Sequence, residues 1–211
     1  MFVKKYNQEY VNPFILERAD PYVIKGDDDF YYFTASYPMK SDKDTNGYDR
    51  VVLRRARELT ELPKAEEKTI WQATENTESH RFIWAPELHK IAGKWYVFYA
   101  GSCSTENNWA FDCRVLQCQG QDPYNDIWVE KGKFQKLPED DFSFTGFSLD
   151  MTYFEANGKS YVIWAQHSPE KISCLYMGEV NPAEPWKLIS LPMLLTCLLY
   201  TSPSPRDTER S

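Results

Sequence analysis

The sequence predicts an all-β protein built from repeated units, and three observations support this fold class. Short runs of aromatic and β-branched residues are bounded by Gly, Asp, Asn and Pro, which is the pattern of strands joined by turns. The periodicity expected of helices is scarce. The clearest runs also recur at a fixed interval along the chain, which indicates stacked or radially arranged structural units.

Three runs within residues 1–190 show the strand pattern most clearly. They are residues 30–36, 94–101 and 159–166. Each run follows a turn signal, at Gly26–Asp29, Ala92-Gly93 and Asn157-Gly158 in that order. Outer strands such as 51–53 and 114–118 are expected to complete the sheets.

The repeat has a period of 65 residues, which is the interval between Tyr31, Tyr96 and Tyr161. A unit of this length with several short strands fits a blade of a β-propeller, in which four-stranded sheets surround a central channel. Residues 1–190 hold a little under three such units, and a closed propeller needs four to eight blades. The sequence therefore predicts a partial β-propeller domain at 1–190, truncated to about three blades.

The C-terminal segment 191–211 differs in character from the rest of the chain. It lacks alternation of apolar and polar residues, and its last part, from Cys197 onward, resembles the translation of a sequencing adapter. Pro203 and Pro205 cannot donate hydrogen bonds to a sheet. We expect this segment to be a non-native read-through tail that does not pack as a blade strand, with a natural Ser/Pro-rich tail as the alternative.

The charge balance excludes several classes of partner. The chain has 31 acidic and 24 basic residues, a net charge of -7 and no basic block. Nucleic acids and anionic membranes are bound through concentrated Lys and Arg, so neither is expected as a partner. No apolar run reaches the roughly 18 residues of a membrane-spanning helix.

The N-terminus and the cysteines bear on the cellular location. No apolar segment typical of a secretory signal follows the first charged residues, so a cytoplasmic location is expected. The five cysteines are odd in number and match no metal-ligand spacing, so we expect reduced structural thiols, no bound metal and no cofactor.

Two carboxylates occupy equivalent positions of the repeat. Asp20, Ala85 and Asp150 are again 65 residues apart, each eleven residues before a repeated Tyr. If the first strand of each blade lines the channel, these positions converge at one mouth of it. Paired carboxylates that face one cavity are what cleavage of a glycosidic bond needs. The alternative is that each Asp only caps a turn at the start of a strand.

Four motifs occur in order and together resemble glycoside hydrolase family 43. They lie at residues 12–21, 31–36, 81–89 and 93–100, and the resemblance extends over about residues 10–190. It implies a five-bladed β-propeller and an inverting hydrolase. The implied substrate is an arabinose- or xylose-containing oligosaccharide, with α-L-arabinofuranosidase activity first and β-xylosidase activity second.

The resemblance also assigns roles to the two aspartates. Asp20, in an Ala-Asp-Pro triplet, matches the general base that activates water, and Asp150 matches the second Asp, which tunes the pKa of the general acid. The acid itself is a Glu that would lie about one period after Asp150, beyond Ser211. The resemblance therefore predicts that the chain is inactive by itself.

Four further residues are candidates for substrate binding. Trp84 would stack on a sugar ring or pack between blades. His80 and Arg81 would reach sugar hydroxyls from the channel rim, or form an exposed loop pair, and Phe147 would shape the pocket beside Asp150. Two polar residues of the motifs are interpreted only as support for the strand: Glu87 and His89.

Two other functions stay open at this stage. One is a propeller that binds sugars without cleaving them, and a Glu about one period after Asp150 would argue against it. The other is an enzyme of the invertase or levansucrase type, which acts on fructosides. Those families carry Asp-Pro-Asn and Arg-Asp-Pro motifs, whereas the second unit of this chain has Trp84-Ala-Pro-Glu87.

Overall fold

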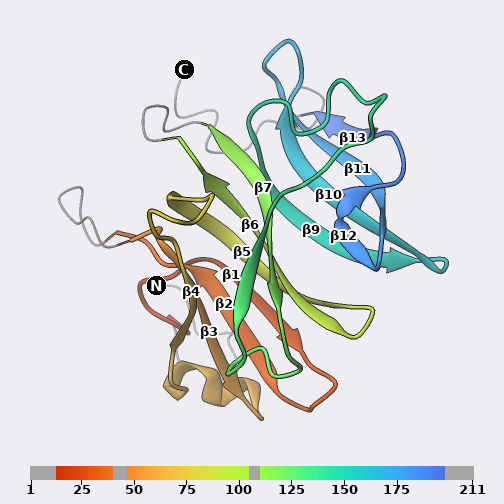
Figure 1. Ribbon diagram of the computed structural model, residues 1–211. Helices are drawn as coiled ribbons and strands as arrows, with labels where there is room; N and C mark the ends of the chain where they lie inside the picture. Colours follow the sequence, from red (N-terminus) through yellow and green to blue (C-terminus); the bar gives the residue numbers. More distant parts are fainter. Residues whose placement is uncertain (1–12, 40–46, 105–109, 198–211) are drawn as a thin grey trace, which may run out of the picture.

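The fold is all-β, as the sequence predicts, and consists of three antiparallel sheets that follow one another along the chain (Figure 1). The computed structural model describes residues 13–39, 47–104 and 110–197. Within these ranges, the helical structure is a short 3-10 helix, η1 (Leu59–Lys64), between the third and fourth strands. No helix in this part of the chain is long and apolar enough to cross a membrane.

The first two sheets have four strands each and the third has five. The first four strands of every sheet follow sequence order, so each connection among them joins neighbouring strands. The first sheet contains β1 (Ala19–Lys25), β2 (Tyr31–Ser36), β3 (Arg50–Ala56) and β4 (Lys68–Gln72). The second contains β5 (Arg81–Ile91), β6 (Lys94–Ser102), β7 (Phe111–Cys118) and β8 (Trp128–Lys133). The third contains β9 (Ser148–Ala156), β10 (Lys159–His167), β11 (Ser173–Asn181) and β12 (Glu184–Leu188), and a fifth strand, β13 (Met193–Cys197), pairs with β11.

The 65-residue repeat corresponds to one sheet. Tyr31, Tyr96 and Tyr161 lie on β2, β6 and β10, the second strand of each sheet. The predicted outer strands 51–53 and 114–118 lie within β3 and β7.

Two of the predicted hairpin turns are two-residue loops with left-handed backbone at both positions. Ala92 and Gly93 have φ values of 47° and 77°, and Asn157 and Gly158 have 53° and 73°. Positive φ at both central residues matches the right-handed twist of the strands on either side, and glycine adopts it without steric cost. These turns fix the register of the first two strands in the second and third sheets.

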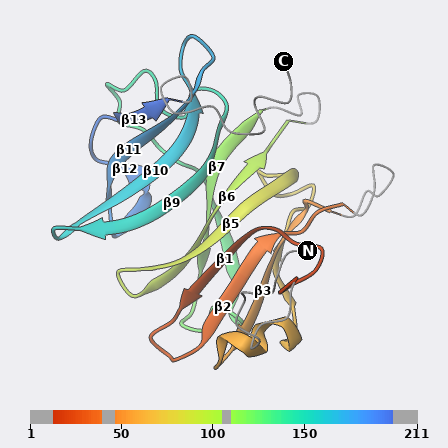
Figure 2. The ribbon, with the colours of Figure 1, turned by 180° about the vertical axis from the view of Figure 1, so that it is seen from behind.

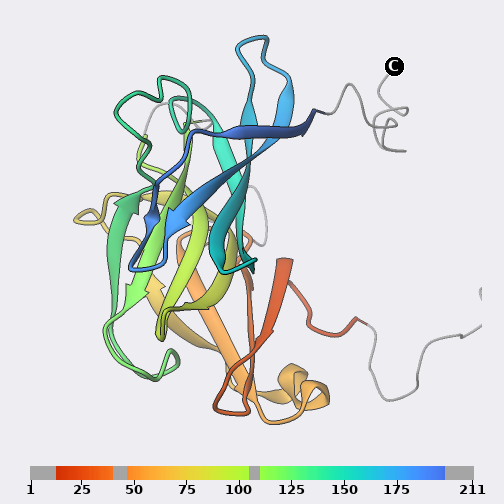
Figure 3. The ribbon, with the colours of Figure 1, turned by 90° about the vertical axis from the view of Figure 1, so that its right-hand side faces the viewer.

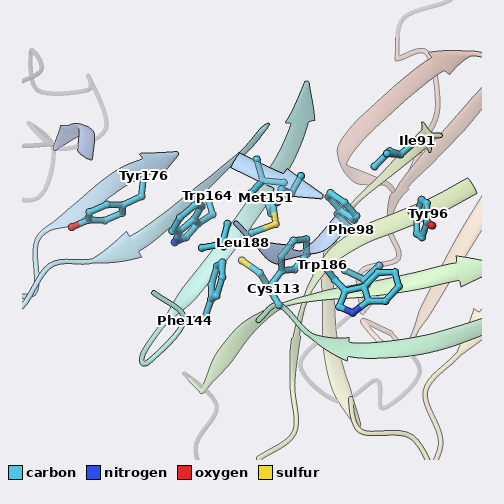
Figure 4. Close-up of a cluster of buried hydrophobic side chains, with 14 of the residues drawn as sticks. Ile91, Tyr96, Phe98, Cys113, Phe144, Met151, Trp164, Tyr176, Trp186 and Leu188 are labelled. Carbon is cyan, nitrogen blue, oxygen red and sulfur yellow. The ribbon is translucent and has the colours of Figure 1, made fainter. Parts of the chain in front are cut away.

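The sheets pack against one another through aromatic and aliphatic side chains. Residues from the first and second sheets share one core cluster, which includes Tyr32, Leu53, Trp95 and Tyr99. A second cluster joins the second and third sheets, and Figure 4 shows Phe98, Cys113, Met151, Trp164 and Trp186 within it. Because each sheet buries its apolar face against the next one, the three sheets form one continuous structure.

Segment 191–211, which was expected not to pack as a blade strand, adds one run, Met193–Cys197, to the edge of the third sheet. This run forms β13 at the outer edge of β11, beyond the stretch that pairs with β12 (Figure 3). An edge strand offers unpaired N–H and C=O groups to any extended segment, so pairing there does not require alternation of apolar and polar residues. Three apolar side chains of β13 accordingly stay exposed: Met193, Leu194 and Leu195. Residues 198–211, including Pro203 and Pro205, lie outside the described residues.

The expectation of reduced thiols is wrong for two cysteines. The pairing of β11 with β13 places Cys174 opposite Cys197, and the two form a disulfide. Cys113 and Cys118 are free and buried, as expected of structural thiols, and Cys103 is free and exposed. An odd count of cysteines could not show which of them a strand pairing would bring together.

Candidate active site

The first strands of the three sheets, β1, β5 and β9, lie side by side, as Figure 2 shows from behind. Asp20, Ala85 and Asp150 occupy the same place on these strands and share a left-handed backbone, with φ values of 50°, 43° and 52°. The pairing with the neighbouring strand shifts register around each of the three. The repeat therefore carries one β-bulge per sheet at this position, and bulges often turn side chains toward active sites.

The bulged positions meet at one cavity of about 250 Å³. Its described lining residues are Asp20, Pro21, Tyr22, Ala85, Glu87 and Asp150. The structure therefore brings together both aspartates that the sequence singles out, and it adds a third carboxylate. A larger cavity of about 690 Å³ beside η1 is lined mainly by basic and apolar side chains and has no pair of carboxylates.

Asp20 is held by a buried hydroxyl group. Ser36 on β2 donates a hydrogen bond from Oγ to Asp20 Oδ2 at 2.9 Å, and the same Oγ accepts one from the Ala85 backbone N–H at 2.8 Å. Ser36 has no exposed surface. This one side chain therefore links β1 to β5 at the cavity and fixes one oxygen of the Asp20 carboxylate.

Asp150 differs from an ordinary aspartate in its affinity for a proton. Its side chain opens onto the cavity, yet the surrounding protein removes enough water to raise its pKa from 3.8 to about 6, and the negative charges of Asp20 and Glu87 act in the same direction. Asp150 therefore takes up a proton at a pH at which an ordinary aspartate is fully ionised.

Glu87 and Tyr22 also line the cavity, although the sequence indicated Glu87 only as support for its strand and gave Tyr22 no role. Glu87 Oε2 lies 3.1 Å from Nε2 of the buried His89. The hydroxyl of Tyr22 lies 3.4 Å from His89 Nδ1. A signal for both was present, because Tyr22 and Glu87 are also 65 residues apart and each follows a bulged position by two residues.

Trp84 and Phe147 do not line this cavity within the described residues. The Trp84 ring packs against Phe111, with ring centroids 4.3 Å apart, and against Tyr48 and Phe82. Phe147 stacks on His167 at 4.7 Å. The ring of Trp84, which the sequence predicts as a possible contact for a sugar, thus contacts three other aromatic rings in the structure.

His80 and Arg81 also lie away from the carboxylates. The guanidinium of Arg81 donates to the Ser104 carbonyl oxygen at 3.0 and 3.2 Å. His80 lines a separate cavity together with Ala73, Thr74 and Glu75. No group of three or more His, Cys, Asp or Glu side chains in the described ranges is arranged to hold a metal ion.

Comparisons with known proteins place this site in a family. The sequence profile of the glycosyl hydrolases family 43 matches residues 10–190. An extracellular exo-α-(1→5)-L-arabinofuranosidase of Streptomyces chartreusis is 40% identical over 181 residues, which are 85% of this chain and 50% of that protein. The α-L-arabinofuranosidase 43 of Humicola insolens is 41% identical over 182 residues, 85% of this chain and 34% of that protein. The chain thus spans half or less of the length of these curated relatives.

Solved structures agree with this result. The crystal structure of an α-L-arabinofuranosidase from Lactobacillus brevis is 38% identical and superposes with a TM-score of 0.76, covering 90% of this chain and 56% of that one. A thermostable family-43 glycoside hydrolase shares the fold at 18% identity and a TM-score of 0.65, covering 89% of this chain and 56% of that one.

The relatives also correct one expectation. Two Streptomyces relatives are named as extracellular enzymes, which contradicts the cytoplasmic location expected from the N-terminal sequence. With matching motifs, sheets and relatives, the chain belongs to the glycosyl hydrolases family 43.

Proposed function

We propose that this chain carries part of the active site of a secreted α-L-arabinofuranosidase that releases arabinofuranosyl residues from oligosaccharides. The observation that supports the proposal most strongly is the cavity itself, where Asp20 and Asp150 meet from equivalent positions of two sheets. The relatives that are 38–41% identical and named as arabinofuranosidases favour this sugar over xylose. The extracellular names of two relatives support secretion.

In this proposal the mechanism is inverting and the complete fold is a five-bladed propeller, of which the chain supplies about three blades. Asp20 accepts a proton from the attacking water, and Ser36 holds its carboxylate in place. Asp150 adjusts the proton affinity of the acid that protonates the leaving group. That acid is a Glu in the part of the protein that follows this chain, so the chain alone does not turn over substrate.

The test uses the full-length protein that contains this chain, assayed on aryl α-L-arabinofuranoside and aryl β-D-xyloside. Asp20→Asn should lower kcat by about 10²- to 10⁴-fold on the arabinofuranoside while substrate still binds, because the general base is lost. Asp29→Asn is the matched control, since Asp29 also has a left-handed backbone, with a φ of 65°, but lies in an exposed hairpin turn. Undiminished turnover in Asp20→Asn would refute the role of Asp20.

Two further measurements test the rest of the proposal. Proton NMR of the first product formed should show inversion at the anomeric carbon. The 211-residue chain, assayed beside the full-length protein, should show no turnover above background. Equal turnover by the 211-residue chain and the full-length protein would show that the missing acid is not needed. Faster cleavage of the xyloside than of the arabinofuranoside would show that xylose, not arabinose, is the preferred sugar.

A further inference from the structure

Glu87 is the third carboxylate of the cavity, and its place in the repeat explains why it is there. Tyr22, Glu87 and Thr152 each follow a bulged position by two residues, on β1, β5 and β9. Of these three, Tyr22 and Glu87 line the cavity together with Asp20, Ala85 and Asp150. In the second sheet, the bulged position holds Ala85, and the carboxylate lies two residues further along the strand.

The Glu87 carboxylate has a partner in the buried imidazole of His89. An ionised carboxylate only accepts hydrogen bonds, so the proton of His89 lies on Nε2 and is donated to Glu87. Nδ1 is then free to accept from the Tyr22 hydroxyl, and that hydroxyl keeps its proton because burial and the charge of Glu87 raise the pKa of Tyr22 to about 12. His89 is 3% exposed and packs against Phe98 and Tyr153. The imidazole therefore cannot swing away and release Glu87.

The charges that act on Asp150 within the described residues are both negative. Asp20 faces it from β1 and Glu87 from β5. From β7, the Cys113 thiol lies near it, and burial raises the pKa of that thiol so far that it stays neutral. No lysine or arginine in this part of the chain offsets the two carboxylates at Asp150.

We propose that Glu87, anchored by His89, is a positioning residue that, together with burial and Asp20, helps to keep Asp150 protonated through electrostatic repulsion across the cavity that both carboxylates line. Asp150 then carries a proton in mildly acidic conditions and releases it as the pH approaches neutrality. The catalytic consequence rests on the proposed function, in which an ionised Asp150 acts on the general acid. The coupling between Glu87 and Asp150 does not depend on turnover and can be measured by itself.

The first experiment measures the titration of Asp150 by carbon-13 NMR of aspartate carboxyl groups in the full-length protein, with Asp150→Asn to assign the signal. Glu87→Gln should lower the midpoint of Asp150 by less than one pH unit, because burial and Asp20, which contribute more to the raised pKa, both remain. The control is Glu155→Gln, which removes the same charge from an exposed position on β9 and should leave the midpoint unchanged. An unchanged midpoint in folded Glu87→Gln protein overturns the inference.

A second variant keeps the inference testable if Glu87→Gln does not fold. Glu87→Ala removes the same charge and should also lower the Asp150 midpoint. An unchanged midpoint in folded Glu87→Ala protein would overturn the inference.

Activity separates this inference from the proposed function. In the full-length protein, Glu87→Gln should move the acidic limb of the kcat/KM profile to lower pH by the shift seen in NMR, and Glu87→Asp, which keeps the charge, should move it less. An NMR shift without a kinetic shift would support the coupling and remove its catalytic consequence. If Glu87→Gln does not shift the Asp150 midpoint while Asp20→Asn is inactive, the coupling is refuted and the proposed function still holds.

Discussion

Removal of the Ser36 hydroxyl tests how strongly the cavity depends on the link between β1 and β5. Ser36→Ala takes away a hydrogen bond to the Asp20 carboxylate and leaves the Ala85 N–H without its acceptor in a buried place. A hydrogen bond to a charged group contributes about 1.5–3 kcal/mol, and an unsatisfied buried donor costs about 1–3 kcal/mol. Since Asp20 itself is exposed and can bind water, we expect a loss of about 2 kcal/mol in the free energy of unfolding.

Ser36→Ala should lower kcat/KM more than a substitution elsewhere that destabilises the fold by the same amount. Thr34→Val is the matched control, because Thr34 lies on the same strand, is equally buried and donates its hydroxyl to the Val52 carbonyl oxygen at 2.8 Å, away from the cavity. Urea unfolding and kcat/KM would be measured for both variants of the full-length protein. We expect kcat/KM to fall about tenfold in Ser36→Ala and to stay unchanged in Thr34→Val. Equal kcat/KM values in the two folded variants would refute the positioning of Asp20 by Ser36.

Three further outcomes are expected. The raised pKa of Asp150 means that the native state holds a proton that the unfolded chain releases, so Asp150 lowers the free energy of unfolding as the pH rises from about 4 to about 6. Urea titrations should show that Asp150→Asn removes this loss, and a parallel pH dependence of the two proteins would contradict it. Gly158→Ala should lower the free energy of unfolding by about 1 kcal/mol, because Gly158 has a φ of 73° and an added methyl group would meet no other atom. The same titrations measure this loss, and its absence would mean that the turn can change its conformation. Trp164→Ala should cost about 3–5 kcal/mol because it empties the centre of the cluster between the second and third sheets, and a loss below about 1 kcal/mol would show that this cluster is poorly packed.

The sequence predicted the parts of the fold that depend on local pattern. The two-residue turns at Gly93 and Gly158 and the aromatic strands that follow them are local features, so strand positions and the repeat could be found without a structure. The position of Asp20 and Asp150 in one cavity followed from the repeat, because equivalent residues of stacked units occupy equivalent places.

What the sequence did not predict depends on contacts between units. Trp84 matched a sugar-stacking residue by type, and only the structure shows that its partly buried ring also packs against Phe82 and Tyr48. Ser36 looked like the end of a strand, and only the approach of β5 gives its hydroxyl a second partner. Likewise, Cys174 and Cys197 become partners only because β13 pairs with β11.

Ala85 shows that the left-handed backbone at this cavity is a property of the fold and does not depend on which side chain occupies the position. Left-handed backbone is uncommon outside glycine and is best tolerated by Asn and Asp, so the aspartates at 20 and 150 suit the bulge. Ala85 adopts the same conformation, with a φ of 43°, without any functional group to gain from it. The bulge therefore does not require a carboxylate, and the methyl group of Ala85 lines the cavity together with the two aspartates.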